Sequence, residues 1–204
     1  FFKQKTAYEI RNCDWSSDVC LPIYVNGGGI QNHRHAFTAI MLAGMIAAVA
    51  VSLTTLPTVF VDDGAHPLGN DANYHAARML MVADDPGSTY SFDPNLHWPE
   101  GTWITWTWGY DYFAGVLASI LTSSAQGANN LIMFYPLVWL LLSTAVVGLV
   151  ARQILTPPLQ LISVLAYATA PMTLKLFGIG ELDHHGAEHA LFLLSMYIAG
   201  RFLR

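Results

Sequence analysis

Charge and cysteine are both scarce in this chain. Of its 204 residues, 11% are charged and 53% are hydrophobic, whereas soluble domains carry about 25% charged residues. The nine Lys and Arg residues form no basic patch, which excludes nucleic acid as a partner. The shortage of charge therefore predicts an integral membrane protein.

The two cysteines, Cys13 and Cys20, both lie within residues 1–23. This segment resembles a translated sequencing adapter, so we interpret residues 1–23 as a non-native artefact and exclude them from reasoning about the fold. Without them, no disulfide framework and no cysteine metal site is left. Residues 24–35, which follow, are predicted to be a flexible lead-in.

Long apolar runs are abundant, and a bilayer core needs about 20 such residues per helix. We therefore predict an all-α, polytopic transmembrane fold over residues 36–204, with about four spanning helices and a long first outer loop, 61–130, that contains interfacial helices. The expected spans are about 36–60, 131–151, 158–179 and 187–203.

The outer loop contains two helical stretches. Asn70 and Asp71 are suited to cap a short helix over 72–83. Residues 103–123 are apolar but rich in Trp and Tyr, which favour the membrane interface. If 103–123 does not cross, Arg34, Arg152, Arg201 and Arg204 lie on one side, and the eleven acids outside residues 1–23 lie on the other. This arrangement satisfies the positive-inside rule.

The polar stretch 180–189 carries three acids and three histidines between apolar runs, and ionisable groups next to a membrane are costly unless they function. The topology brings it to the extracytoplasmic side together with Asp71. Carboxylates and one imidazole suit Mg²⁺ or Mn²⁺, so we predict Asp71, Asp183 and His185 as metal ligands. The alternative is that Asp183 only caps the next helix.

The same stretch fits a second metal pattern. His185, Glu188 and His189 match the His-x-x-Glu-His signature of membrane zinc peptidases, in which two histidines bind Zn²⁺ and the Glu is the base. A third zinc ligand is not evident in the sequence.

Three motifs, in order, resemble those of oligosaccharyltransferase catalytic subunits. They are Asn-Asp-Ala-Asn-Tyr-His-Ala-Ala-Arg over 70–78, Phe-Asp-Pro-Asn-Leu-His-Trp-Pro-Glu-Gly over 92–101, and Asp-His-His-x-x-Glu over 183–188. The resemblance covers about 36–204 and implies the amino-terminal fragment of a GT-C glycosyltransferase, so we expect the fragment alone to be inactive.

The resemblance also implies a reaction. Such enzymes transfer a glycan from a polyprenyl (di)phosphate donor to an acceptor, for this family the amide of an asparagine in a polypeptide. Asp71, Asp183 and His185 would hold Mn²⁺ or Mg²⁺, which stabilises the departing phosphate, and Asp71 would also contact the acceptor amide. The site would lie on the extracytoplasmic side of the membrane, the inner membrane if the cell is bacterial.

Some residues depart from the family pattern. An Arg often precedes the second acidic motif, but here the nearest cation is Lys175, which either binds the donor phosphate or extends its amine to the membrane surface. Arg78 is expected to pair with a loop acid, and Asp111, on an apolar segment, is expected to face inward without an assigned role. The remaining alternatives are a transferase with a lipid or polysaccharide acceptor, and a non-enzymatic transporter part.

Overall fold

The computed structural model describes residues 29–61, 64–87, 91–93, 96–97, 99–104 and 108–202. The predicted adapter, residues 1–23, and residues 24–28 of the predicted lead-in lie outside these ranges. Residues 29–35 belong to the first described helix rather than to a flexible lead-in. The chain divides into two units, 1–38 and 39–204, and the candidate site described below lies in the second.

The described chain is mostly helical, which confirms the predicted fold class. Its elements in order are α2 (Gly29–Ser52), η1 (Leu53–Thr55), α3 (Leu56–Val59), β1 (Phe60–Val61), β2 (Gly64–Ala65), α4 (Asn70–Asp84), β3 (Phe92–Asp93), β4 (Thr102–Trp103), α5 (Gly109–Leu121), α6 (Ala125–Ile132), α7 (Tyr135–Ile154), α8 (Pro157–Thr169), α9 (Pro171–Phe177) and α10 (His184–Phe202). The strands form two short antiparallel pairs, β1 with β2 and β3 with β4.

Two helical segments among the described residues are long and apolar enough to cross a membrane, Arg34–Val59 and Ala125–Ile154. A third candidate is the pair α8 and α9, which is bent by 54°. The bend follows from Pro171, because the residue before a proline is disfavoured in the helical conformation, and Ala170 is accordingly extended (φ −63°, ψ 138°). The fourth expected span, 187–203, falls in α10, which is long enough at 19 residues but is not among the candidate spans of the described chain.

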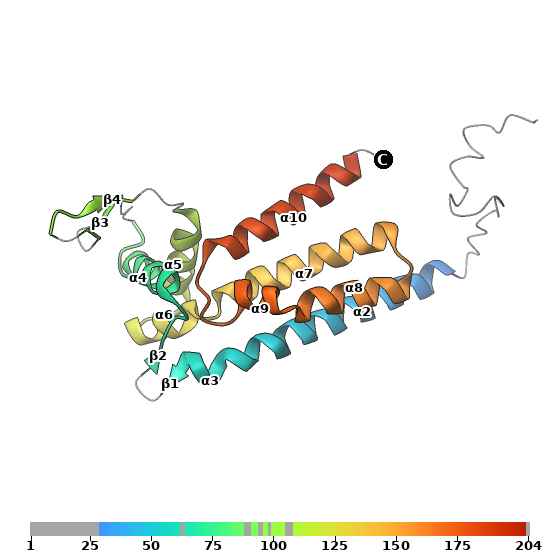
Figure 1. Ribbon diagram of the computed structural model, residues 1–204, viewed down its shortest axis with the longest axis horizontal. Coiled ribbons are helices and arrows are strands. Elements are labelled where there is room, and N and C mark those ends of the chain that lie inside the picture. Colours follow the sequence, from blue (N-terminus) through green and yellow to red (C-terminus); the bar gives the residue numbers. More distant parts are fainter. Residues whose placement is uncertain are drawn as a thin grey trace, which may run out of the picture. The chain divides into compact units, whose positions relative to one another are not determined.

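Helix α7 is the centre of the long helices, since it packs against α8, α9 and α10 (Figure 1). Gly44 of α2 and Gly148 of α7 let the helices approach closely. A Cβ on Gly44 would collide with Val164 of α8, and one on Gly148 would collide with Met41. Small residues at such crossings are typical of helix packing in membranes.

Helices α4, α5 and α6 pack together at one end of the long helices (Figure 1). The predicted helix 72–83 is confirmed as α4, which starts two residues earlier. The expected helix 103–123 begins later, at Gly109, because Thr102 and Trp103 form β4 instead. There the Trp103 ring packs on Phe92 of β3, with ring centroids 5.5 Å apart.

Candidate metal and histidine site

The predicted ligands lie at the starts of two helices that a loop contact ties together. Asp71 is in the first turn of α4 and is exposed, and Asp183 directly precedes α10. The backbone N–H of Leu68, just before α4, donates to the carbonyl of Gly180, just before α10, over 2.8 Å. The two acidic motifs, more than a hundred residues apart, therefore meet at one end of the helices.

Asp183 has the local role of a helix cap. Its Oδ1 accepts a hydrogen bond from the backbone N–H of His185 over 3.2 Å and lies 3.1 Å from Nδ1 of His184. A carboxylate there satisfies a free N–H of the first turn and faces the positive end of the helix dipole. Asp183 thus caps α10, as the alternative interpretation expected, and its carboxylate also lies beside His184 and His185.

His185 is held by Glu188 one turn along α10. Its Nδ1 lies 3.0 Å from Oε2 of Glu188. This hydrogen bond raises the pKa of the His185 imidazole, burial opposes it, and the charges of Asp183, Glu188 and Asp71 raise it further. Asp71 is therefore within electrostatic reach of His185. The Glu188 contact occupies Nδ1, so Nε2 is the nitrogen with which His185 would bind a metal.

A buried cluster of three charged or titratable side chains lies behind this surface. Asp111 of α5 is 1% exposed, and Oδ1 lies 2.6 Å from Nδ1 of His75 on α4, which is also 1% exposed. Nε of Arg78, 4% exposed, lies 3.0 Å from Oδ2 of Asp111. The expected pairing of Arg78 with an acid is confirmed, although the acid is on a helix, and Asp111 faces inward as expected.

The Arg78 guanidinium is enclosed by aromatic rings. Its central carbon lies 5.4 Å from the Tyr74 ring centroid and 5.8 Å from that of Trp108, distances typical of cation–π contacts. The contact of Nε with Asp111 Oδ2 is an ion pair. Burial raises the pKa of the Tyr74 hydroxyl, and the charge of Arg78 and its hydrogen bond to that hydroxyl partly lower it. Asp111 is thus the carboxylate in direct contact with the Arg78 guanidinium, and the buried Asp93 also acts on this region, through its charge on Tyr74.

His75 links the buried cluster to the surface motif. Its Nε2 lies 3.2 Å from Nδ1 of His184, and the edge of its ring meets Tyr110, with centroids 5.8 Å apart. Burial raises the pKa of the Tyr110 hydroxyl well above its usual value, so Tyr110 packs here as a neutral group. One continuous series of contacts therefore runs from Arg78 to the start of α10.

Two groups of side chains among the described residues have ligand atoms close enough for one metal ion. They are His75 with Asp183 and His184, and His184 with His185 and Glu188. Asp71 belongs to neither group, so its part in a metal site stays a prediction. Sequence reasoning passed over His75 and His184 as ligands.

The zinc peptidase pattern is not assembled in the described residues. His189 is absent from both groups, and its ring stacks on Tyr167 of α8, with centroids 6.0 Å apart and planes at 10°. Phe177 of α9 contacts the same ring from another side. His189 is thus used in packing α10 against α8 and α9.

Lys175, the candidate phosphate ligand, lies in the last turn of α9 and is exposed. It is near Glu181: burial and the charge of Asp183 raise the pKa of the Glu181 carboxyl, and Lys175 partly lowers it. Lys175 therefore lies on the same side of the molecule as the second acidic motif.

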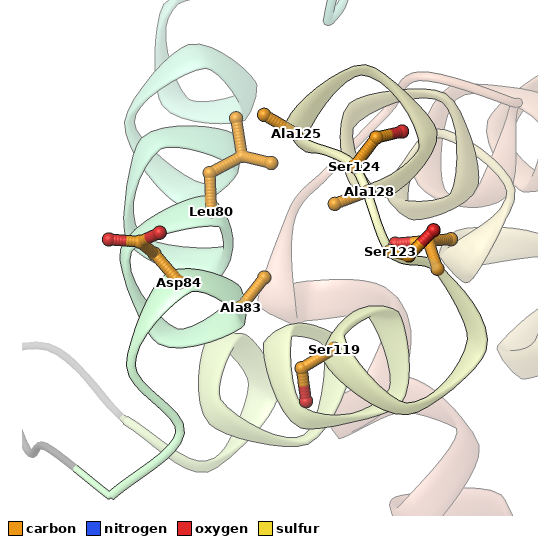
Figure 2. Close-up of a pocket in the computed structure, with 9 residues that line it drawn as sticks. Leu80, Ala83, Asp84, Ser119, Ser123, Ser124, Ala125 and Ala128 are labelled. Carbon is orange, nitrogen blue, oxygen red and sulfur yellow. The ribbon is translucent and has the colours of Figure 1, made fainter.

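A cavity of about 260 Å³ lies apart from these residues, between α4, α5 and α6 (Figure 2). Three of its four hydroxyls already bond to backbone groups: Ser119 and Thr122 donate to carbonyls of α5, and Ser124 accepts from Gly127. The Asp84 carboxylate points away from α5 and α6 (Figure 2). Most of the polar groups that line the cavity are thus already used within the fold.

Comparison with known proteins identifies one relative. The chain is 32% identical over 163 residues to the dolichyl-phosphooligosaccharide-protein glycotransferase 1 of Archaeoglobus fulgidus. The match covers 78% of this chain and 26% of the relative. The chain thus spans about a quarter of that protein. No protein-family model matches the chain, and no solved structure does. The predicted resemblance to the oligosaccharyltransferase family is confirmed.

Proposed function

Because the chain is related to the oligosaccharyltransferases, we propose that it forms part of a membrane glycosyltransferase that moves a glycan from a polyprenyl (di)phosphate to a polypeptide asparagine. The observation that carries the proposal is the similarity to the Archaeoglobus glycotransferase over 78% of the chain. The meeting of two acidic motifs at one end of the long helices supports it.

The metal in this proposal is Mn²⁺ or Mg²⁺, bound by Asp71, Asp183 and His185. The donor set fits, since hard or borderline divalent ions take carboxylate oxygens and imidazole nitrogens, and the Glu188 carboxylate on His185 is the kind of outer partner that orients a metal-binding imidazole. When bound, the ion would offset the negative charge that develops on the departing lipid phosphate.

The chain's own residues supply the remaining parts. Lys175, exposed near the second motif, would bind the donor phosphate as a point charge, and Asp71 would also accept a hydrogen bond from the acceptor amide. The site would face the extracytoplasmic side, where a lipid-bound donor and a secreted acceptor meet. Because the chain spans about a quarter of its relative, we expect it to be inactive alone.

The test is a chimaera in which this chain replaces the 163 matched residues of the Archaeoglobus relative. With a lipid-linked oligosaccharide, a fluorescent acceptor peptide and Mn²⁺, we expect a glycopeptide shift on a gel. Asp71→Asn and Asp183→Asn should each lower the rate at least about 100-fold, the scale of losing charge stabilisation in a transition state. Asp84→Asn, an exposed acid of α4, is the control. An inactive chimaera, or full activity in both Asn variants, would contradict the proposal.

A further inference from the structure

We propose that His75 is a positioning residue for the second acidic motif, and that it sets the direction of the Asp183 carboxylate through the ring of His184. The buried Asp111 orients His75 for this role. The inference leaves Asp183 in the role that the proposed function gives it. Its consequence for glycan transfer rests on that function, whereas the order of the side chains is a property of this chain alone.

The tautomer of His75 follows from its contact with Asp111. Both side chains are 1% exposed, and Oδ1 of Asp111 lies 2.6 Å from the imidazole Nδ1. An ionised carboxylate only accepts hydrogen bonds, so Nδ1 carries the hydrogen and Nε2 carries the lone pair. The Tyr110 ring packs edge-on against the imidazole, with centroids 5.8 Å apart. The His75 ring is therefore held in one orientation, with Nε2 as its acceptor.

His184 connects His75 to Asp183. Its Nδ1 lies 3.2 Å from Nε2 of His75 and 3.1 Å from Oδ1 of Asp183. Because the other two atoms are acceptors, Nδ1 of His184 is the donor, and its hydrogen lies between them as in a three-centre hydrogen bond. Oδ1 of Asp183 also accepts from the backbone N–H of His185 over 3.2 Å. Two donors therefore hold one carboxylate oxygen, and His75 fixes the direction of one of them.

The Asp183 carboxylate needs such donors because another acid lies close to it. Burial and the charge of Asp183 raise the pKa of the Glu181 carboxyl, so the two carboxylates repel each other. The Asp183 side chain is 28% exposed, which leaves it room to turn towards water and away from Glu181. The hydrogen bonds from His184 and His185 oppose that turn. Because the contact with His75 holds the His184 ring, it also decides how firmly Asp183 is held.

Backbone contacts place the second acidic motif but do not set the direction of this side chain. The N–H of Leu68 donates to the carbonyl of Gly180 over 2.8 Å, and the N–H of Gly180 donates to the carbonyl of Met133 over 2.9 Å. These bonds fix the loop before α10. The contact between His75 and His184 adds a link between side chains 109 residues apart, and it acts on torsions that the backbone leaves free.

Two substitutions of His75 separate its two contacts, because asparagine and glutamine each keep the position of one imidazole nitrogen. The amide nitrogen of His75→Asn lies where Nδ1 lies and donates to Asp111, but the side chain is too short to reach His184. The amide of His75→Gln reaches the position of Nε2, where its oxygen accepts from His184, but the contact with Asp111 is lost. We therefore expect His75→Asn to free the Asp183 carboxylate and His75→Gln to keep it in place.

The readout is hydrogen exchange of the His185 amide, measured by NMR on the 204-residue chain in detergent, since that amide donates to Asp183. His75→Asn should speed this exchange about two- to tenfold, the effect of losing about one hydrogen bond, and His75→Gln should change it less than about twofold. The amides of Leu68 and Gly180, which are in backbone bonds, should exchange as in the wild type. If His75 only fills the interior, exchange should instead follow the melting temperature of each variant.

A measurement on the wild type stands even if a variant fails to fold. With ¹⁵N-labelled histidine, NMR should show His75 protonated at Nδ1. It should also show a scalar coupling between Nδ1 of His184 and Nε2 of His75, because such a coupling is transmitted through a hydrogen bond and not through ring packing.

The transferase chimaera measures the consequence for the reaction. His75→Asn should lower kcat about 10–100-fold, the range for outer partners that orient the ligands of a site, and should leave KM for the acceptor peptide unchanged. His75→Gln should retain kcat within about threefold of the wild type, as a variant that keeps the orienting contact. His66→Gln, which replaces an exposed histidine, is the control.

Three results would overturn the inference. They are wild-type exchange at His185 in His75→Asn, exchange in His75→Gln at least as fast as in His75→Asn, and no coupling between the two imidazoles in the wild type. Each of them leaves Asp71→Asn and Asp183→Asn in the chimaera as an independent test of the proposed function. An inactive chimaera with the expected exchange and coupling would contradict that function and support the positioning role.

Discussion

Replacing Asp111 by alanine should destabilise the chain strongly, because it removes the carboxylate that contacts the buried Arg78 guanidinium. The carboxylate is 1% exposed, and its partners Arg78 and His75 are 4% and 1% exposed. Breaking a buried ion pair by removing one partner costs about 3–5 kcal/mol. The hydrogen-bond acceptor of His75 is lost in the same variant.

The aromatic rings around Arg78 reduce this cost. Cation–π contacts contribute about 0.5–2 kcal/mol each, and Tyr74 and Trp108 both lie within 6 Å of the guanidinium. We therefore place the loss for Asp111→Ala near the lower limit, about 3 kcal/mol. A chain of 150–250 residues loses about 2–4 °C of melting temperature per kcal/mol, so the expected drop is about 6–12 °C.

The assay is thermal unfolding of the purified chain in one detergent, followed by tryptophan fluorescence. Asp84→Ala, which removes an exposed acid at the last residue of α4, should stay within about 0.5 kcal/mol of the wild type. The double variant Arg78→Met with Asp111→Leu should recover most of the loss, because replacing a whole buried ion pair by apolar groups is often neutral. The reasoning would be refuted if Asp111→Ala had the melting temperature of the wild type, or if the double variant had the melting temperature of Asp111→Ala.

Three other predictions test packing and electrostatics. Gly44→Ala should lower the free energy of unfolding by about 1–3 kcal/mol through overpacking, and with it the melting temperature, because the added Cβ meets Val164. Gly200→Ala is the control, since nothing lies near its Cβ. Glu188→Gln should lower the pKa of His185, which NMR titration measures. Because that pKa is raised in the fold, the stabilisation by Glu188 is present below about pH 6.5 and is lost as the pH rises through the folded pKa. An unchanged titration would disprove the contact. Glu181→Gln should raise the melting temperature at pH 7, because burial and Asp183 raise the Glu181 pKa and so disfavour its charged form in the fold. The gain should vanish below about pH 4, where the wild-type carboxyl is protonated in both the folded and unfolded states. An equal gain at every pH would count against this prediction.

The helices were predictable from local patterns, and the meeting of the two acidic motifs was predictable from the placement of charges about the expected spans. Apolar runs predicted most of the spans. The capping role predicted for Asn70 and Asp71 was wrong, because both lie inside α4 and Gly69 is its cap. The bend at Pro171 follows from proline chemistry but was not anticipated within the expected span 158–179. The extent of α5 was missed because Trp103 pairs with Phe92 in a strand, which aromatic content alone does not indicate.

The buried cluster could be predicted only in part. Asp71, His75 and Arg78 are spaced four and three residues apart, so a helix brings them towards one face, and an acid such as Asp111 on an apolar segment signals an inward partner. What the spacing does not indicate is that α5 packs on α4 with Asp111 beside His75, 36 residues away. That pairing is a tertiary contact, and so is the contact of His75 with His184, 109 residues away.

Gly180 explains how these distant segments are held in register. Its backbone carbonyl accepts from Leu68 before α4, and its N–H donates over 2.9 Å to Met133 between α6 and α7. The residue has a φ of +85°, which glycine adopts without strain, and a Cβ would lie 2.6 Å from Val59. One glycine thus joins the end of α3, the loop before α4 and the loop before α10. The buried Asp111–His75 pair and the exposed Asp183 motif therefore face each other because the backbone fixes them there, and contacts among the histidines follow from that placement.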